Sequence, residues 1–138
     1  ETAIPPLESR QITRLDFDGA LEHQSPREVI FAAELRAGGE EAGTLIATFV
    51  PNKHLDLRDP RLEMSVRQVD GQLEIRVTAH SAARFIELDF RGTDAVFSDN
   101  YFDLPANRSR TIHVSIPQGI SAAEAQAQLQ MRSLFDSY

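Results

Sequence analysis

Cysteine and tryptophan are both absent from this 138-residue sequence. The lack of cysteine excludes disulfides, thiolate metal sites and cysteine nucleophiles. Lysine is scarce as well: Lys53 is the one lysine among 14 basic residues, and the others are arginine. We interpret this bias as the codon usage of a GC-rich bacterial genome, and it carries no information about function.

Clustered positive charge is also missing. The net charge is −7, and the 14 basic residues are scattered along the chain. Nucleic acids and anionic membrane surfaces both attract basic clusters, so we expect neither as a partner. No apolar run approaches the roughly 18 residues that would suggest a membrane-spanning helix. The compartment stays open, and a periplasmic or secreted location is compatible with the sequence.

What is present has the composition of a globular domain, with 41% hydrophobic and 25% charged residues. The length favours one domain with its own core. The first residues contain no initiating Met, basic region or signal-peptide core, which favours a fragment cut from a longer polypeptide. We predict that residues 1–8 form an extended lead-in from a preceding domain and that residues 9–138 form one domain.

Alternation of apolar and polar residues, typical of half-buried antiparallel strands, dominates the sequence. It predicts strands over residues 29–35, 62–67, 73–80, 86–90 and 111–116, with less regular candidates at 11–17 and 44–50. Asp70-Gly71 lies between two of these runs and predicts a tight hairpin, because it readily adopts the positive φ angles of a type I′ turn. Seven or eight short strands at even spacing indicate a β-sandwich rather than a βαβ fold.

Residues 121–128 are predicted to form one short helix. Ser121 and Glu124 have the spacing of a capping box, and alanine-rich sequence follows. Alternation resumes at residues 129–133, which we predict as a last strand. Residues 52–60 are expected to form a loop, because Pro51 and Pro60 bound them.

The segment FSDNYFDL (residues 97–104) resembles a segment near the C-terminus of β-mannosidases of glycoside hydrolase family 2. Other segments resemble that family in the same order along the chain: IPPLESRQI, FVPNKHLDL, AARFIELDF and RSLFDSY, the last as a closing strand. Together they span nearly the whole sequence. One departure is Pro105-Ala106-Asn107, where the family often has a Pro-Gly-Glu-type turn, so this turn is expected to differ.

This resemblance implies an all-β fold, an immunoglobulin-like antiparallel sandwich of seven to eight strands, at the end of a multidomain glycosidase. The two catalytic glutamates of the family lie on an upstream (β/α)8 barrel of about 250 residues, which is too large for this chain. The parent would be a retaining enzyme that hydrolyses terminal non-reducing β-D-mannose residues. The chain itself would be a non-catalytic accessory domain without cofactor or metal. Its partners would be the upstream barrel and sandwich domains of the same polypeptide.

The turn also contains candidate binding residues. Asp99, Asn100 and Asp103 bring oxygen donors close together and could bind calcium, although their spacing is not that of an EF-hand. We favour an Asx turn, in which such side chains bond the local backbone. Tyr101 and Phe102 could form an exposed platform for stacking a sugar. We favour packing of one of them into the end of the sandwich, as a tyrosine-corner-like plug with its hydroxyl on the backbone.

The residues that we predict at a contact with another domain are Lys53, His54, Asp56, Tyr101 and Phe102. The first three belong to the most polar loop of the chain, at residues 52–60. The alternative for that loop is a solvated surface with weak ion pairs.

Histidine does not indicate a metal site, because no two histidines lie three or four positions apart. His80 and His113 fall on the polar phase of predicted strands and are expected to face solvent. We assign no catalytic residue in this chain.

Other functions fit the sequence less well. An independent carbohydrate-binding module would need aromatic faces, and the chain has no Trp and two Tyr. A free-standing hydrolase is disfavoured, because there is no G-x-S-x-G motif. The same domain of a related exo-β-glucosaminidase stays an alternative parent.

Overall fold

The computed structural model describes residues 3–115 and 120–138, with the backbone alone at residues 40 and 41. The helical elements are short: α1 (Asp18–Leu21), η1 (Asn52–His54), α2 (Ala122–Gln128) and η2 (Leu134–Ser137). The strands are β1 (Ile30–Ala37), β2 (Glu40–Thr48), β3 (Glu63–Val69), β4 (Gln72–Ala79), β5 (Ala83–Phe90), β6 (Val96–Phe97), β7 (Phe102–Leu104), β8 (Arg108–Ser115) and β9 (Leu129–Arg132).

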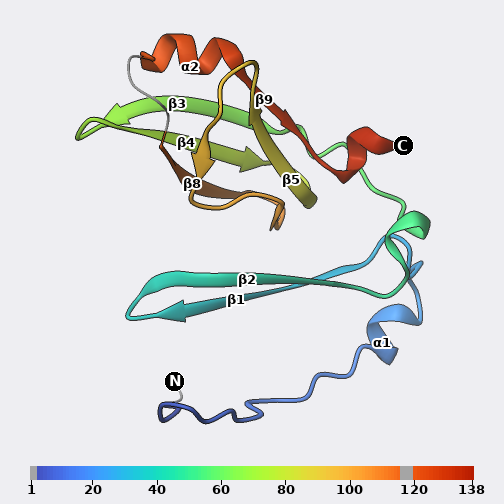
Figure 1. Cartoon of the computed structure of the whole chain (residues 1–138). Coiled ribbons are helices and arrows are strands. Elements are labelled where there is room, and N and C mark those ends of the chain that lie inside the picture. The colour runs from blue at the N-terminus through green and yellow to red at the C-terminus, as the bar shows by residue number, and fades with distance from the viewer. Residues whose placement is uncertain (1–2, 116–119) are drawn as a thin grey trace.

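Two antiparallel sheets form a sandwich over the C-terminal part of the chain. One has the strand order β3-β4-β8-β6 and the other the order β7-β5-β9. The hairpin β1–β2 is a sheet of its own, and Figure 1 shows it below the two facing sheets. The predicted all-β, immunoglobulin-like antiparallel sandwich is therefore confirmed.

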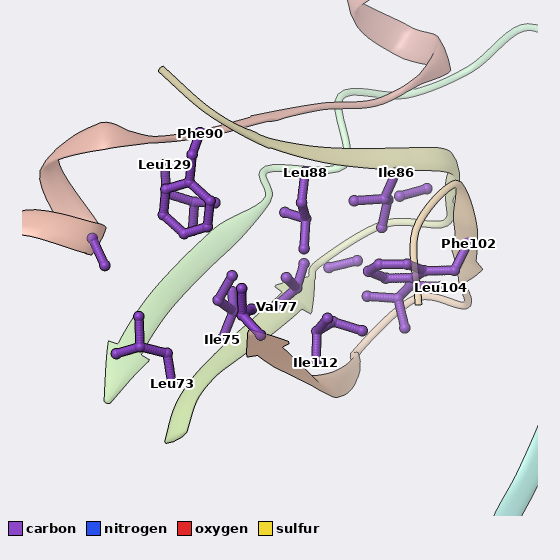
Figure 2. Close-up of a cluster of buried hydrophobic side chains, with 14 residues drawn as sticks. Leu73, Ile75, Val77, Ile86, Leu88, Phe90, Phe102, Leu104, Ile112 and Leu129 are labelled. Carbon is purple, nitrogen blue, oxygen red and sulfur yellow. The ribbon is translucent and has the colours of Figure 1, made fainter. Parts of the chain in front are cut away.

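The core lies between the facing sheets. The most completely buried large side chains come from three strands: Ile75, Val77, Ile86, Leu88 and Ile112. Figure 2 shows the side chains of β5 pointing toward those of β4 and β8. Buried and more exposed residues alternate along β4, as period-2 patterning requires. Burial of this one face holds the two sheets together, because apolar area removed from water is the main stabilising contribution.

Local signals set the ends of several elements. Asp70 and Gly71 have φ angles of 50° and 81°, so the predicted type I′ hairpin between β3 and β4 is confirmed. The predicted capping box is also present, with Ser121 and Glu124 bonding each other's backbone N–H groups. Helix α2 then packs on β3, where Gln126 Oε1 accepts a hydrogen bond from Val66 N at 2.8 Å.

Three expectations for the elements differ from the structure. Residues 11–17 form no strand, because alternation makes a strand only where another strand pairs with it. The segment RSLFDSY does not close the fold as a strand; β9 ends at Arg132, and the carboxylate of Asp136 accepts from Ser133 N to start the 3-10 helix η2. The turn segment at 97–104 contributes to two short strands, β6 and β7, that were not predicted. Residue 116, the predicted end of a strand, lies outside the described residues.

The core predicts a large cost for truncation at its centre. Replacing the fully buried Ile75 with Ala leaves a cavity and should lower the free energy of unfolding by about 2–5 kcal/mol in urea titrations. The control Val96→Ala removes a side chain that is 71% exposed and should change stability by no more than about 0.5 kcal/mol. Equal effects of the two substitutions would contradict this placement of the core.

Candidate functional site

The segment at residues 97–104 joins the two sheets of the sandwich, because β6 belongs to one sheet and β7 to the other. Its apolar residues fix both ends. Phe97 stacks on Phe90 with ring centroids 5.7 Å apart, and Phe102 and Leu104 are buried in the core. Figure 2 shows Phe102 and Leu104 pointing toward the side chains of β5 and β8. The polar residues between these anchors are thereby held against β5 and β8.

Asn100 takes the place of a paired strand residue. Its Oδ1 accepts from Leu88 N at 2.8 Å, and its Nδ2 donates to the Leu88 carbonyl at 2.9 Å. The pairing of β5 with β7 includes Ile86 opposite Phe102, so Leu88 falls opposite position 100. The side-chain amide therefore continues the ladder for one residue beyond the short strand β7. It also accepts from Tyr101 N at 3.0 Å.

The other polar side chains of the turn bind groups of the protein that are distant in sequence. Asp99 pairs with Arg110 at 2.6 Å, and the Oγ of Ser98 accepts from His113 N at 3.0 Å. Asp103 pairs with Arg84 and also accepts from Phe85 N at 2.9 Å. The predicted local bonding is therefore found in part: Asn100 does bond the adjacent Tyr101 N, whereas Ser98, Asp99 and Asp103 bond groups well beyond the local backbone. The three calcium candidates are each bonded to the protein itself.

The described residues contain no group of three or more His, Asp or Glu side chains that could hold a metal ion. His80 and His113 lie on the outer side of the four-stranded sheet, each beside a glutamate, with side chains 39% and 57% exposed. Their predicted solvent-facing position is confirmed.

Tyr101 points away from the core. It has a positive φ of 58°, is 62% exposed, and donates from its hydroxyl to the Glu87 carboxylate at 2.9 Å. The predicted tyrosine-corner bond to the backbone is therefore not formed, and Phe102 is the aromatic residue that packs inside. Glu87 also pairs with Arg132, which lies opposite it on β9.

The contacts among Tyr101, Glu87 and Arg132 shift the pKa values of Glu87 and Tyr101. Hydrogen bonds from Arg132 and then from Tyr101 hold the pKa of Glu87 below its usual value. The same carboxylate raises the pKa of Tyr101, because it stabilises the protonated phenol. Tyr101, Glu87 and Arg132 thus connect the turn with β5 and β9 as one hydrogen-bonded row on the outside of the three-stranded sheet.

The junction loop, residues 52–57, is bonded to the sandwich through Asn52. Arg84 Nη1 donates to Asn52 Oδ1 at 2.8 Å, and the Tyr138 hydroxyl donates to the Asn52 carbonyl at 2.6 Å. Leu55, three positions after Asn52 in the same loop, is buried. Arg84 also reaches Asp103, so one guanidinium connects the junction loop with strand β7.

The predicted contact residues of this loop present their side chains to solvent. Lys53, His54 and Asp56 are all exposed. The backbone beside them is bonded, since the His54 carbonyl accepts from Arg27 Nε at 2.8 Å and Asp56 N donates to the Arg27 carbonyl at 2.9 Å. A pocket of about 320 Å³ opens here, and charges of both signs line it.

Of the five predicted contact residues, four are therefore on the surface. Phe102 is 5% exposed and lies in the core, so its side chain is not available on this surface. Contact of the other four with another domain stays a prediction. Sequence reasoning missed Asn52, Arg84 and Glu87, whose roles depend on partners far away in the chain. The one signal that could have found any of them is cross-strand pairing. If the pairing of β5 with β9 had been known, the opposite charges of Glu87 and Arg132 would have predicted their ion pair.

Two protein-family models match this chain, and the matched ranges meet at the junction loop. Residues 57–137 match the Ig_mannosidase model, described as an Ig-fold domain. The chain belongs to the Ig_mannosidase family. It therefore matches an Ig-like domain of mannosidase-type glycoside hydrolases. Residues 1–54 match a second model, Mannosidase_ig, described as a mannosidase Ig/CBM-like domain. Among curated proteins, no relative matches the chain.

The boundary between the two matches falls in the junction loop. The Ig_mannosidase match begins at residue 57, and the bonds of Asn52 to Arg84 and Tyr138 connect the two matched regions. The segment at residues 97–104, by contrast, lies wholly inside the region that matches Ig_mannosidase. Among the described residues, no helix is both long and apolar enough to cross a membrane.

Asn100 gives a direct test of how the Ig_mannosidase turn is held. Asn100→Ala leaves the N–H and carbonyl of Leu88 without their partner, so the free energy of unfolding should fall by about 1–3 kcal/mol. The control Gln68→Ala shortens an exposed amide and should stay within about 0.5 kcal/mol. An Asn100→Ala protein as stable as the control would show that the side-chain ladder contributes nothing.

Glu87 should make stability depend on pH. Its pKa is lowered in the folded state, so its contribution is present above its unfolded pKa of about 4.3 and is lost as the pH falls through the folded value. Urea unfolding should show a larger loss from Glu87→Gln at pH 7 than at pH 3. The control Glu8→Gln changes a carboxylate of the N-terminal segment. A loss from Glu87→Gln that is the same at both pH values would contradict a role for its charge.

Proposed function

We propose that this chain is a non-catalytic accessory domain of a β-mannosidase of glycoside hydrolase family 2. The parent would hydrolyse terminal non-reducing β-D-mannose residues. The task of the chain would be structural, to pack against the catalytic barrel and the other sandwich domains of the same polypeptide. The match to mannosidase Ig-type domains supports this proposal, and the segment FSDNYFDL supports the narrower assignment to β-mannosidases.

The proposal rests mainly on how the side chains of residues 97–104 are bonded and packed within the fold. Asp99, Asn100 and Asp103 are each bonded to strands of the same fold, and Phe102 and Leu104 fill the core. Polar side chains that bond other strands of the same fold favour a structural role for this segment. It is poorly suited to binding a substrate, which would have to compete with these bonds.

Three glutamate carboxyl groups are bonded within the chain and have lowered pKa values: a hydrogen bond from Arg108 acts on Glu34, one from Arg132 on Glu87 and the Ser121 backbone on Glu124. A lowered pKa keeps each of these carboxylates charged at neutral pH, as the acceptor of a structural hydrogen bond.

The surface residues Lys53, His54, Asp56 and Tyr101 are the proposed contacts with the rest of the enzyme. The first three lie on the junction loop, and Tyr101 stands on the outside of the three-stranded sheet. Such contacts would make the stability of the catalytic domain depend on this domain, although the reaction takes place elsewhere.

Hydrolysis of an aryl β-mannoside by the full parent polypeptide tests both parts of the proposal. We expect turnover of the β-mannoside in preference to the matching β-glucosaminide. Deletion of residues 57–138 should abolish activity or sharply lower the temperature of inactivation. Because the deletion could simply prevent folding, Asn100→Ala in the parent is the milder variant. It should leave kcat/KM at 20 °C unchanged and lower the inactivation temperature by about 5 °C.

Two results would contradict the proposal. Equal activity and equal thermal inactivation of the full and deleted polypeptides would refute a bracing role and leave glycan binding as the better explanation. Preference for the β-glucosaminide would refute the assignment of the parent to the β-mannosidases.

A further inference from the structure

The hairpin β1–β2 carries one face that is apolar and open. In its register, Phe31 lies opposite Ala47, Ala33 opposite Leu45, and Leu35 opposite Gly43. Residues directly opposite each other point to the same side of a sheet. This apolar face therefore consists of six uncharged residues: Phe31, Ala33, Leu35, Gly43, Leu45 and Ala47.

The leucines of the apolar face are far more exposed than the leucines of the strands that form the core. Leu35 is 61% and Leu45 62% exposed, whereas the leucines of β4 and β5 are almost completely buried. A continuous apolar patch on a protein surface usually marks an interaction site.

The opposite face of the hairpin is the one that meets the sandwich. Glu34 pairs with Arg108 of β8, and Ile46 is 7% exposed. Strand β2 also contacts β7. Because successive side chains of a strand point to opposite sides, the apolar face points away from the Ig-fold sandwich. Figure 1 shows the hairpin between the two sheets of the sandwich and the N-terminal segment.

A partial core exists at one end of the apolar face. Phe17 packs on Phe31 with ring centroids 4.9 Å apart and on Phe49 at 5.2 Å, and all three rings are half-buried. Within the described residues, the N-terminal segment does not extend this core over Leu35 and Leu45. Its own apolar side chains are exposed: Ile4, Leu7, Ile12 and Leu15.

We propose that the apolar face is the inner face of a second β-sandwich and is covered by the apolar face of another β-sheet of the same polypeptide. The hairpin would belong to the Ig/CBM-like domain that residues 1–54 match, with the covering strands supplied by sequence outside these 138 residues. This inference rests on the proposed function in assuming a longer, multidomain polypeptide. It places a domain boundary in the junction loop, instead of the boundary after residue 8 that the sequence suggested.

The chemistry of the apolar face favours a sheet as its occupant. Small and aliphatic side chains on a pleated two-stranded surface fit the face of another sheet, which packs about 10 Å away in β-sandwiches. No charge is present to pair with an ionic partner. A two-stranded hairpin is also marginal by itself in water and needs further strands or a packed layer.

Hydrogen exchange in two polypeptides tests the proposal: the 138-residue chain and the longer parent. In the 138-residue chain, we expect the backbone amides of β1 and β2 to exchange at least about 100-fold faster than those of β4 and β8, because the hairpin opens locally. In the parent, the hairpin amides should be protected to nearly the same degree as the sandwich. This comparison of unmodified proteins does not depend on whether any variant folds.

Leu45→Glu in the parent should then reduce hairpin protection by at least about tenfold, because it places a charge in the covered interface. The matched control Val96→Glu introduces the same charge at another exposed apolar residue, on β6, and should leave hairpin protection unchanged. In the 138-residue chain, neither substitution should alter hairpin exchange.

Other outcomes overturn the proposal. Equal hairpin protection in both polypeptides at every concentration would show that nothing needs to cover the apolar face. Protection that appears in the 138-residue chain only as its concentration rises would identify a second copy as the occupant. Aryl β-mannoside hydrolysis measured on the same parent sample separates the two hypotheses, since a parent without that activity would refute the proposed function and leave the exchange result standing.

Discussion

Strand β5 is the element on which the rest of the fold depends, because its inner face, both of its edges and its outer face all make contacts with other elements. Its inward side chains, Ile86, Leu88 and Phe90, meet the opposite sheet in the core. One edge pairs with β9, and the other pairs with β7 and then with the side chain of Asn100. Its outward residue Glu87 bonds both Tyr101 and Arg132. A buried strand must satisfy its backbone groups as well as its apolar face, and here a turn side chain completes that requirement.

The parts of the fold that could be predicted from the sequence are those encoded by neighbouring residues. Alternation identified β3, β4, β5 and β8, Asp70-Gly71 identified the hairpin turn, and Ser121 with Glu124 identified the start of α2. Each of these signals acts within a few residues. The same locality explains the wrong strand at residues 11–17, because alternation alone says nothing about whether a partner strand is present.

The candidate site could be located from the sequence, although its bonding could not. FSDNYFDL attracted attention as a dense aromatic and acidic segment, and the expectation of local bonds followed from the usual behaviour of Asp and Asn in turns. Asn100 does bond the neighbouring Tyr101 N, but it also bonds Leu88, and Asp103 bonds Arg84, across 12 and 19 positions. Pairs at such separations arise only once the sheets have assembled. The junction loop is similar, since nothing near Asn52 in the sequence indicates that Arg84 and Tyr138 bind it.

The side-chain amide of Asn100 also has a consequence for association between molecules. Beyond the three residues of β7, the edge of β5 would offer a free backbone N–H and carbonyl to any extended peptide that approached. Asn100 occupies both groups of Leu88. A side-chain amide offers no backbone groups with which a further strand could pair, whereas a paired strand would. The sandwich is therefore protected there against edge-to-edge aggregation, and the same residue that closes the fold also limits its growth.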